Sequence, residues 1–137
     1  MNDLLIALLT IIPTLEADYN GNPAENALGP YHIRPIMVQE VNRIMKIQKL
    51  EARYTHQDAL DERLAKHMVV VHMRYWGKQY EKRTGMKATI DILARIHNGG
   101  AFGPYKFKTF GYGQRAKNLY EDRQALLEKV ESHVNDL

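Results

Sequence analysis

A cluster of helix-breaking residues early in the chain constrains the fold more than any other feature. Residues 20–30 hold three Asn, two Gly and two Pro. Gly and Pro are the strongest local breakers, so a helix cannot run through this segment. Glu16 closes the apolar run that precedes it. The Glu16 carboxylate is therefore predicted where a helix ends and an irregular or hairpin segment, residues 17–34, folds back, and such edges often carry chemistry.

Hydrophobic periodicity predicts that most of the remaining chain is helical. The run from Met68 to Val71, with Trp76 beyond it, is apolar on several sides, as in a helix buried at the centre of a domain. We therefore predict a mostly α fold: one helical domain, residues 1–137, around a buried central helix, with the short irregular or hairpin segment after the first helix. The first helix runs from a cap at Asn2 or Asp3 to about Glu16 with a kink at Pro13; the others cover about 36–50, 55 or 58 to 82, 87–97 and 112–134, with a loop at 101–111.

Composition excludes several kinds of site. A length of 137 residues suits one domain with a real hydrophobic core. The absence of cysteine excludes disulfides, thiol nucleophiles and zinc–thiolate sites. His67 and His72 stand five residues apart, whereas a helix grips one ion with an i, i+4 pair. We expect no metal and no cofactor. The net charge of +3 favours anionic partners in general, without choosing among wall polymer, nucleic acid and membrane surfaces.

The amino-terminal apolar run is predicted to be a core helix. Leu4–Ile12 is nine residues long, whereas a membrane-spanning helix needs ~20 apolar residues. Asn2 and Asp3 stand where a signal peptide would carry basic residues. We therefore recognise no signal peptide and expect no stable insertion into a membrane.

Three short motifs follow one another along the chain. Glu16 is followed by Asn22-Pro23 and by the corner Gly29–Ile33, which reads GPYHI. Residues 94–100 then read ARIHNGG, and Tyr112 comes after them. In this order the motifs resemble the transglycosylase SLT family of the lysozyme-like superfamily. In that family a Glu ends a helix, an Asn/Pro/Ala turn follows, and G-(L/P)-x-Q-I and Y-N-A-G or H-N-G-G motifs come later. The resemblance implies an α+β lysozyme-like fold.

The resemblance also implies an enzyme that degrades peptidoglycan at the β-1,4 bond between MurNAc and GlcNAc. A carboxyl at an apolar helix end loses hydration of its charged form, so its pKa rises and it can protonate a glycosidic oxygen. Glu16 is thus the predicted catalytic acid/base. The residues expected to bind substrate or to hold Glu16 are Tyr31, His32 (where the family has Gln), Asn98, Gly99 and Tyr112. Each of these residues also has a purely structural interpretation. Glu16 could be a surface glutamate, His32 a structural histidine, Asn98-Gly99 a helix C-cap and Tyr112 a core tyrosine.

Two reaction types are open. A lytic transglycosylase uses one Glu first as acid and then as base, and forms a 1,6-anhydro sugar end. A hydrolytic lysozyme needs a second carboxylate, roughly 5 or 6.5–9.5 Å from the first. Glu25 and Asp18 are the nearby carboxylates. We expect the transglycosylase, because the chain has no obvious second carboxylate in the motifs.

Two further classes are weighed against the enzyme. A non-catalytic wall-binding or structural module could retain the fold, since Pro13 and His32 depart from the family pattern. The stretch Tyr105–Phe110 interleaves basic and aromatic residues, as nucleic-acid stacking platforms do, but no helix-turn-helix pattern accompanies it. We expect a monomer that acts on peptidoglycan glycan strands and binds no nucleic acid. The resemblance implies a place in a phage virion or the host cytoplasm, with action at the bacterial cell wall.

Overall fold

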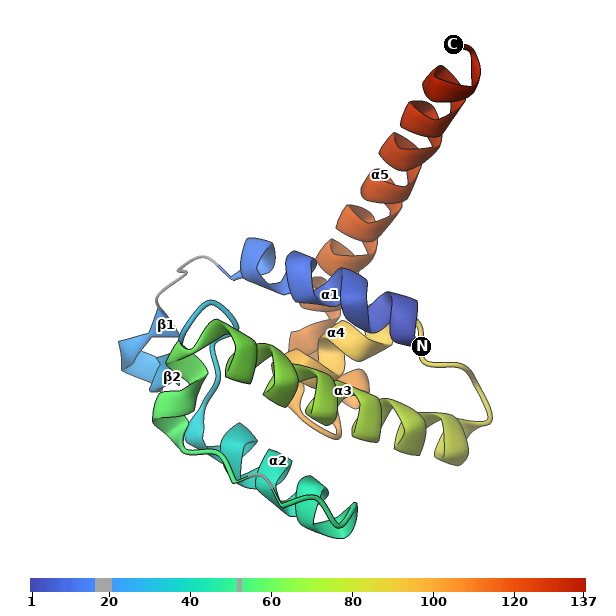
Figure 1. Cartoon of the computed structure of the whole chain (residues 1–137). Helices are drawn as coiled ribbons and strands as arrows, with labels where there is room; N and C mark the ends of the chain where they lie inside the picture. Colours follow the sequence, from blue (N-terminus) through green and yellow to red (C-terminus); the bar gives the residue numbers. More distant parts are fainter. Residues whose placement is uncertain (17–20, 52) are drawn as a thin grey trace.

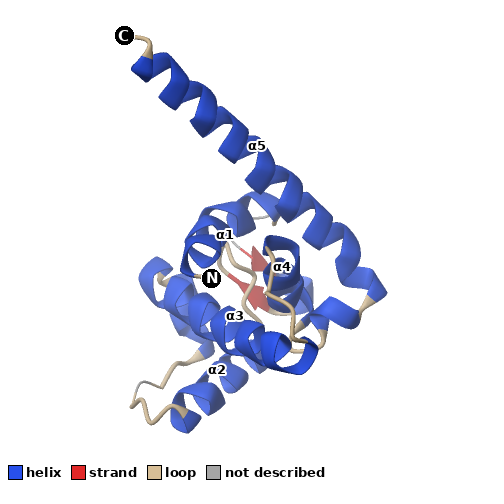
Figure 2. Cartoon of the chain, turned by 90° about the vertical axis from the view of Figure 1, so that its right-hand side faces the viewer, coloured by secondary structure: helices blue, strands red, loops and turns tan. Residues whose placement is uncertain are grey.

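The computed structural model describes residues 1–16, 21–51 and 53–137, and they are mostly helical (Figures 1 and 2). The predicted mostly α fold, with a short hairpin segment after the first helix, is confirmed. The strands β1 and β2 are antiparallel, with Gly21 opposite Leu28 and Asn22 opposite Ala27. The elements are α1 (Asn2–Leu15), β1 (Gly21–Asn22), β2 (Ala27–Leu28), α2 (Pro35–Ile47), α3 (Glu62–Thr84), α4 (Ile90–Gly99) and α5 (Phe110–Asn135).

Helix α1 runs through Pro13 and ends at the predicted point, with Glu16 as its C-cap. A proline inside a helix has no N–H for the carbonyl four residues back. Here the Tyr31 hydroxyl donates to that carbonyl, Leu9 O, at 2.7 Å. The bond from another segment satisfies the group that Pro13 leaves unpaired, so the helix tolerates the proline. The predicted side-chain cap was wrong, because Met1 is the N-cap and no side chain caps this end.

Helix α3 is the predicted central helix, and it packs against α1, α2 and α4 (Figure 1). It begins later than predicted. Thr55 and Asp58 do form a capping box, but the box starts the 3-10 helix η2 (His56–Leu60). Asp61 then caps α3 by accepting from the Leu64 N–H at 3.0 Å. At the other end Gly85 closes the helix with φ +72°, the conformation that glycine adopts most easily.

The loop predicted at 101–111 contains two 3-10 helices, η3 (Gly103–Tyr105) and η4 (Phe107–Thr109). Gly103 lies directly on the backbone of α4, so that a Cβ there would stand 1.9 Å from Arg95 O. The buried Thr109 hydroxyl lies 2.5 Å from Gly103 O and accepts from Arg95 Nε at 3.0 Å. These contacts fix the loop against α4.

Helix α5 leaves the body of the molecule about half-way along its length. Tyr112, Gly113 and Ala116 are buried in its first part, but every residue from Gln124 to Leu137 is exposed. Figure 1 shows this outer half projecting beyond the other helices. In the described residues no helix has the length and apolarity to cross a membrane.

Candidate active site

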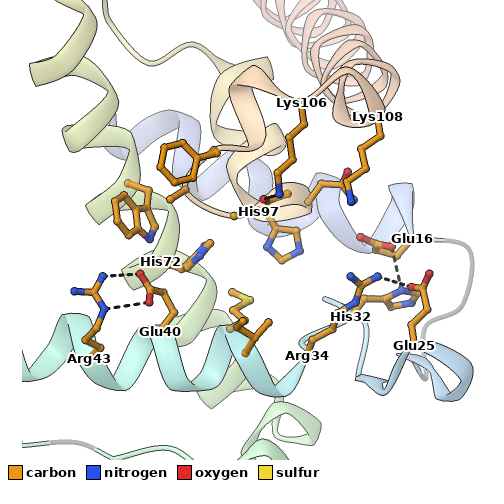
Figure 3. A pocket seen from close by; sticks show the side chains of 18 residues that line it. Glu16, Glu25, His32, Arg34, Glu40, Arg43, His72, His97, Lys106 and Lys108 are labelled. Carbon is orange, nitrogen blue, oxygen red and sulfur yellow. Dashed lines mark hydrogen bonds and ion pairs between the residues drawn. The ribbon is translucent and has the colours of Figure 1, made fainter.

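A cleft with a cavity volume of about 590 Å³ lies between two walls of the molecule (Figure 3). One wall is formed by the hairpin segment and α2, and the other by the end of α4 with η3 and η4. Of the predicted site residues, Glu16, Glu25, His32, Asn98 and Gly99 line it. The cleft is further lined by Arg34, Ile36, Met37, Glu40, Arg43, His72, Trp76, His97, Gly100, Ala101, Phe102, Lys106 and Lys108.

Glu16 stands at one end of the cleft with its carboxyl held by two side chains. Its Oε1 accepts from the Tyr112 hydroxyl at 3.0 Å, and its Oε2 lies 3.1 Å from His32 Nδ1. The side chain is only 15% exposed. Burial raises the pKa of Glu16, an effect partly offset by His32, the Tyr112 hydrogen bond and nearby arginines. The carboxyl therefore retains a proton to higher pH than an ordinary glutamate, as a general acid requires.

His32 reaches Glu16 because of an unusual backbone turn. Its φ is +50°, and its N–H donates to Gly29 O at 3.1 Å. Gly29 itself has φ +73°, and a Cβ there would lie 2.5 Å from Ala59 O, so this corner requires glycine. Non-glycine residues with positive φ are uncommon, although His is among the more tolerant. Such strained positions concentrate at functional sites, and this one aims the imidazole at the carboxyl.

Tyr31 was expected to bind substrate, but it is not among the residues that line this cleft. The residue is 2% exposed, because its hydroxyl is turned into the core to reach Leu9 O on α1. Its carbonyl lies 3.0 Å from His97 Nε2 on α4. Tyr31 thus ties the corner to α1 and to α4, and it acts on the site by holding its neighbour His32 in position.

Asn98 and Gly99 line the cleft at the carboxyl end of α4. Asn98 is exposed. A Cβ on Gly99 would lie 2.6 Å from Thr109 Cγ2, so a larger residue would collide with the η4 turn. The helix C-cap is Gly100, whose φ is +81° and whose N–H donates to Ile96 O at 2.8 Å. The motif therefore both ends the helix and forms part of the cleft wall.

Tyr112, in the first part of α5, is the residue whose hydroxyl donates the hydrogen bond to Glu16. It is 6% exposed and does not line the cleft. Burial and the neighbouring Glu16 carboxylate raise the pKa of Tyr112 far above its usual value, so its hydroxyl keeps its proton and donates. Its position supports the expectation that it holds the acid, and not that it touches the sugar.

Of the two candidates for a second carboxylate, Glu25 and Asp18, the structure describes only Glu25. Glu25 lines the cleft at the same end as Glu16 (Figure 3) and pairs with Arg34 at 2.6 Å, with about half of each side chain exposed. Asp18 lies outside the described residues. The Arg34 guanidinium therefore occupies Oε2 of Glu25, one of the two oxygens that a water-activating base would use.

Several residues of the other end of the cleft were not predicted. Arg43 donates two hydrogen bonds to Glu40, at 2.6 and 3.1 Å, and lies 5.9 Å from the Trp76 ring centroid. Burial lowers the pKa of His72 to about 4 and that of His97 to about 3, so both imidazoles are neutral at pH 7. The spacing of Glu40 and Arg43 is a sequence signal for a helix-surface pair, although it does not tell which way that surface faces. In the described residues no three His, Asp or Glu side chains are grouped to hold a metal ion.

Comparisons with protein-family models, with curated proteins and with solved structures found no match. The likeness to the transglycosylase SLT family therefore rests on the motifs described above.

Proposed function

We propose that this protein is a lysozyme-like, peptidoglycan-degrading enzyme that cleaves the β-1,4 bond between MurNAc and GlcNAc, with Glu16 as the catalytic acid/base. One observation carries the proposal: a shielded carboxyl with a raised pKa stands at the end of a cleft, held by Tyr112 and His32. The motif resemblance adds the substrate class and the expected setting, a phage virion or the host cytoplasm with action at the wall.

Of the two reactions, the lytic transglycosylase is the one we propose. Protonated Glu16 gives its proton to the bridging oxygen, and the GlcNAc–MurNAc strand beyond it leaves. The Glu16 carboxylate then removes the proton of the muramic C6 hydroxyl, whose oxygen attacks C1 and closes the 1,6-anhydro ring. Both steps use one carboxyl, and the Tyr112 hydrogen bond favours its charged form between them. The second carboxylate that a hydrolase needs, Glu25, is engaged by Arg34.

The products released from purified peptidoglycan distinguish the two reactions. We expect mass spectrometry to show 1,6-anhydro ends, and Glu25→Gln to keep the activity within about threefold, because Glu25 activates no water in this mechanism. Reducing ends, together with a loss of about 100-fold in Glu25→Gln, would instead assign hydrolysis with Glu25 as second carboxylate. Release of no fragments at all would favour a non-catalytic wall-binding module.

The pH profile tests the tie between Tyr112 and the acid. Tyr112→Phe removes a hydrogen bond that stabilises the Glu16 carboxylate. The pKa of Glu16 should rise further, so the alkaline limb of the activity profile should move to higher pH, with a drop in maximal rate of about tenfold as the carboxyl loses its orientation. Turbidity clearing measured from pH 4 to 9 provides the readout. A profile that keeps its shape would show that Tyr112 does not set the titration of Glu16.

A further inference from the structure

A long acid-free segment forms one wall of the cleft. Between Ile92 and Tyr120 the chain has no Asp or Glu. The segment covers most of α4, the 3-10 helices η3 and η4, and the start of α5. Lys106 and Lys108 from this segment line the cleft. Its cationic residues are Arg95, Lys106, Lys108, Arg115 and Lys117.

The two lysines have ammonium groups available for a ligand. Lys106 Nζ donates to Gly99 O at 2.7 Å, which uses one of its three hydrogens. Lys108 forms no hydrogen bond or ion pair with the residues that the structure describes. Figure 3 shows both side chains on the wall that faces Glu25, Arg34 and Glu40. This wall therefore carries positive charge that no carboxylate of the described chain neutralises.

The opposite wall is balanced. Glu25 pairs with Arg34, and Glu40 pairs with Arg43. Among the described residues that line the cleft, the only other carboxyl is that of Glu16, whose raised pKa favours its neutral form. The cleft thus attracts negative charge along one side only. A ligand suited to it is a strand that is neutral along its length and carries separate anionic groups to one side.

We propose that Lys106 and Lys108 bind the carboxylates of the peptide stems on a peptidoglycan strand, so that the cleft selects peptide-bearing glycan over neutral N-acetylated glycan. This inference rests on the proposed function, since it names the substrate feature recognised beside Glu16. MurNAc carries its peptide on the lactyl group, to the side of the sugar backbone, and the stem ends in carboxylates. The arrangement of charge agrees with one-sided recognition of that kind.

A nucleic acid fits the cleft less well. The aromatic residues beside the lysines, among them Phe107 at 96% exposed, would suit stacked bases. However, a polynucleotide carries a charge at every step of its backbone. The opposite wall, where Glu25 and Glu40 are each paired with an arginine, offers those charges no net attraction. Nucleic-acid binding is therefore the rival outcome of the test.

The test measures binding in a Glu16→Gln protein, which should leave the ligands intact. The probes are a tetrasaccharide of alternating GlcNAc and MurNAc with peptide stems, and the neutral tetramer of GlcNAc. Adding Lys106→Gln and Lys108→Gln should weaken binding of the peptide-bearing probe about tenfold or more, the scale of a lost charge-assisted hydrogen bond, and should change binding of the neutral probe less than twofold. Salt should weaken only the first probe. The control is Lys78→Gln, an exposed lysine that does not line the cleft.

Three results would overturn the inference. They are unchanged binding of the peptide-bearing probe in the double lysine variant, equal weakening of both probes, and tighter binding of a single-stranded DNA oligonucleotide than of either glycan. The proposed function is tested separately, by cleavage with the unsubstituted protein. Cleavage without lysine-dependent binding would refute only this inference, whereas lysine-dependent binding without cleavage would leave it standing and refute the enzyme.

Discussion

Glu16→Gln is expected to reduce the cleavage of purified peptidoglycan by about 10²- to 10⁴-fold, which is the usual contribution of a general acid–base. The amide has nearly the shape of the carboxyl, can accept from Tyr112 through its oxygen and still occupies the end of the cleft. What it lacks is the proton that must reach the bridging oxygen. The release of soluble muropeptides over time measures the effect.

The same variant should be at least as stable as the parent chain, so that its loss of activity cannot be attributed to unfolding. Because the pKa of Glu16 is raised in the folded state, the folded protein holds this proton to higher pH than the unfolded chain does. Above the ordinary glutamate pKa, deprotonation therefore costs the folded state stability. Gln does not titrate, so its midpoint of thermal unfolding at pH 7 should be equal or higher. Equal activity in both proteins would remove Glu16 from the mechanism.

Gly103→Ala should destabilise the protein by about 3 kcal/mol, near the upper end for an added methyl group in a packed site. The new Cβ would stand 1.9 Å from Arg95 O and 2.7 Å from Arg95 C. Both are backbone atoms, so the η3 turn or α4 has to move. At this chain length the loss corresponds to a fall in the unfolding midpoint of about 10 °C, which thermal denaturation followed by circular dichroism would show.

Gly111→Ala is the matched control for that substitution. It lies in α5, and a Cβ there meets nothing within 4 Å. Alanine is the better helix former by about 1 kcal/mol, so its midpoint should stay or rise slightly. If Gly103→Ala were equally harmless, the close approach of η3 to α4 would not be required for folding.

The helices and the place of Glu16 could be predicted from local patterns. The apolar period defines α2, α4 and α5, and the breakers after Glu16 leave a helix no way to continue. The apolar periodicity and the helix-breaking residues are both local features of the sequence, and the tertiary packing agrees with the elements that they predict.

The remaining features depend on contacts between distant segments. The direction of Tyr31 is set by the carbonyl that Pro13 leaves unpaired, and those residues belong to different elements. Likewise, the sequence predicts only that Glu40 and Arg43 pair on the surface of α2. That this surface lines the cleft depends on how α3 and α4 pack beside it. The sequence motifs therefore predict residues at the Glu16 end of the cleft. The end that holds Glu40 and Arg43 is formed only by tertiary packing.

The outer half of α5 offers a practical handle on the molecule. Residues 124–135 span about 18 Å at a rise of about 1.5 Å per residue, and none of them packs into the core. A label or an immobilising surface attached near Asn135 would be kept at a distance by a stiff spacer. Substrate could then reach the cleft of the anchored protein without steric competition from its support.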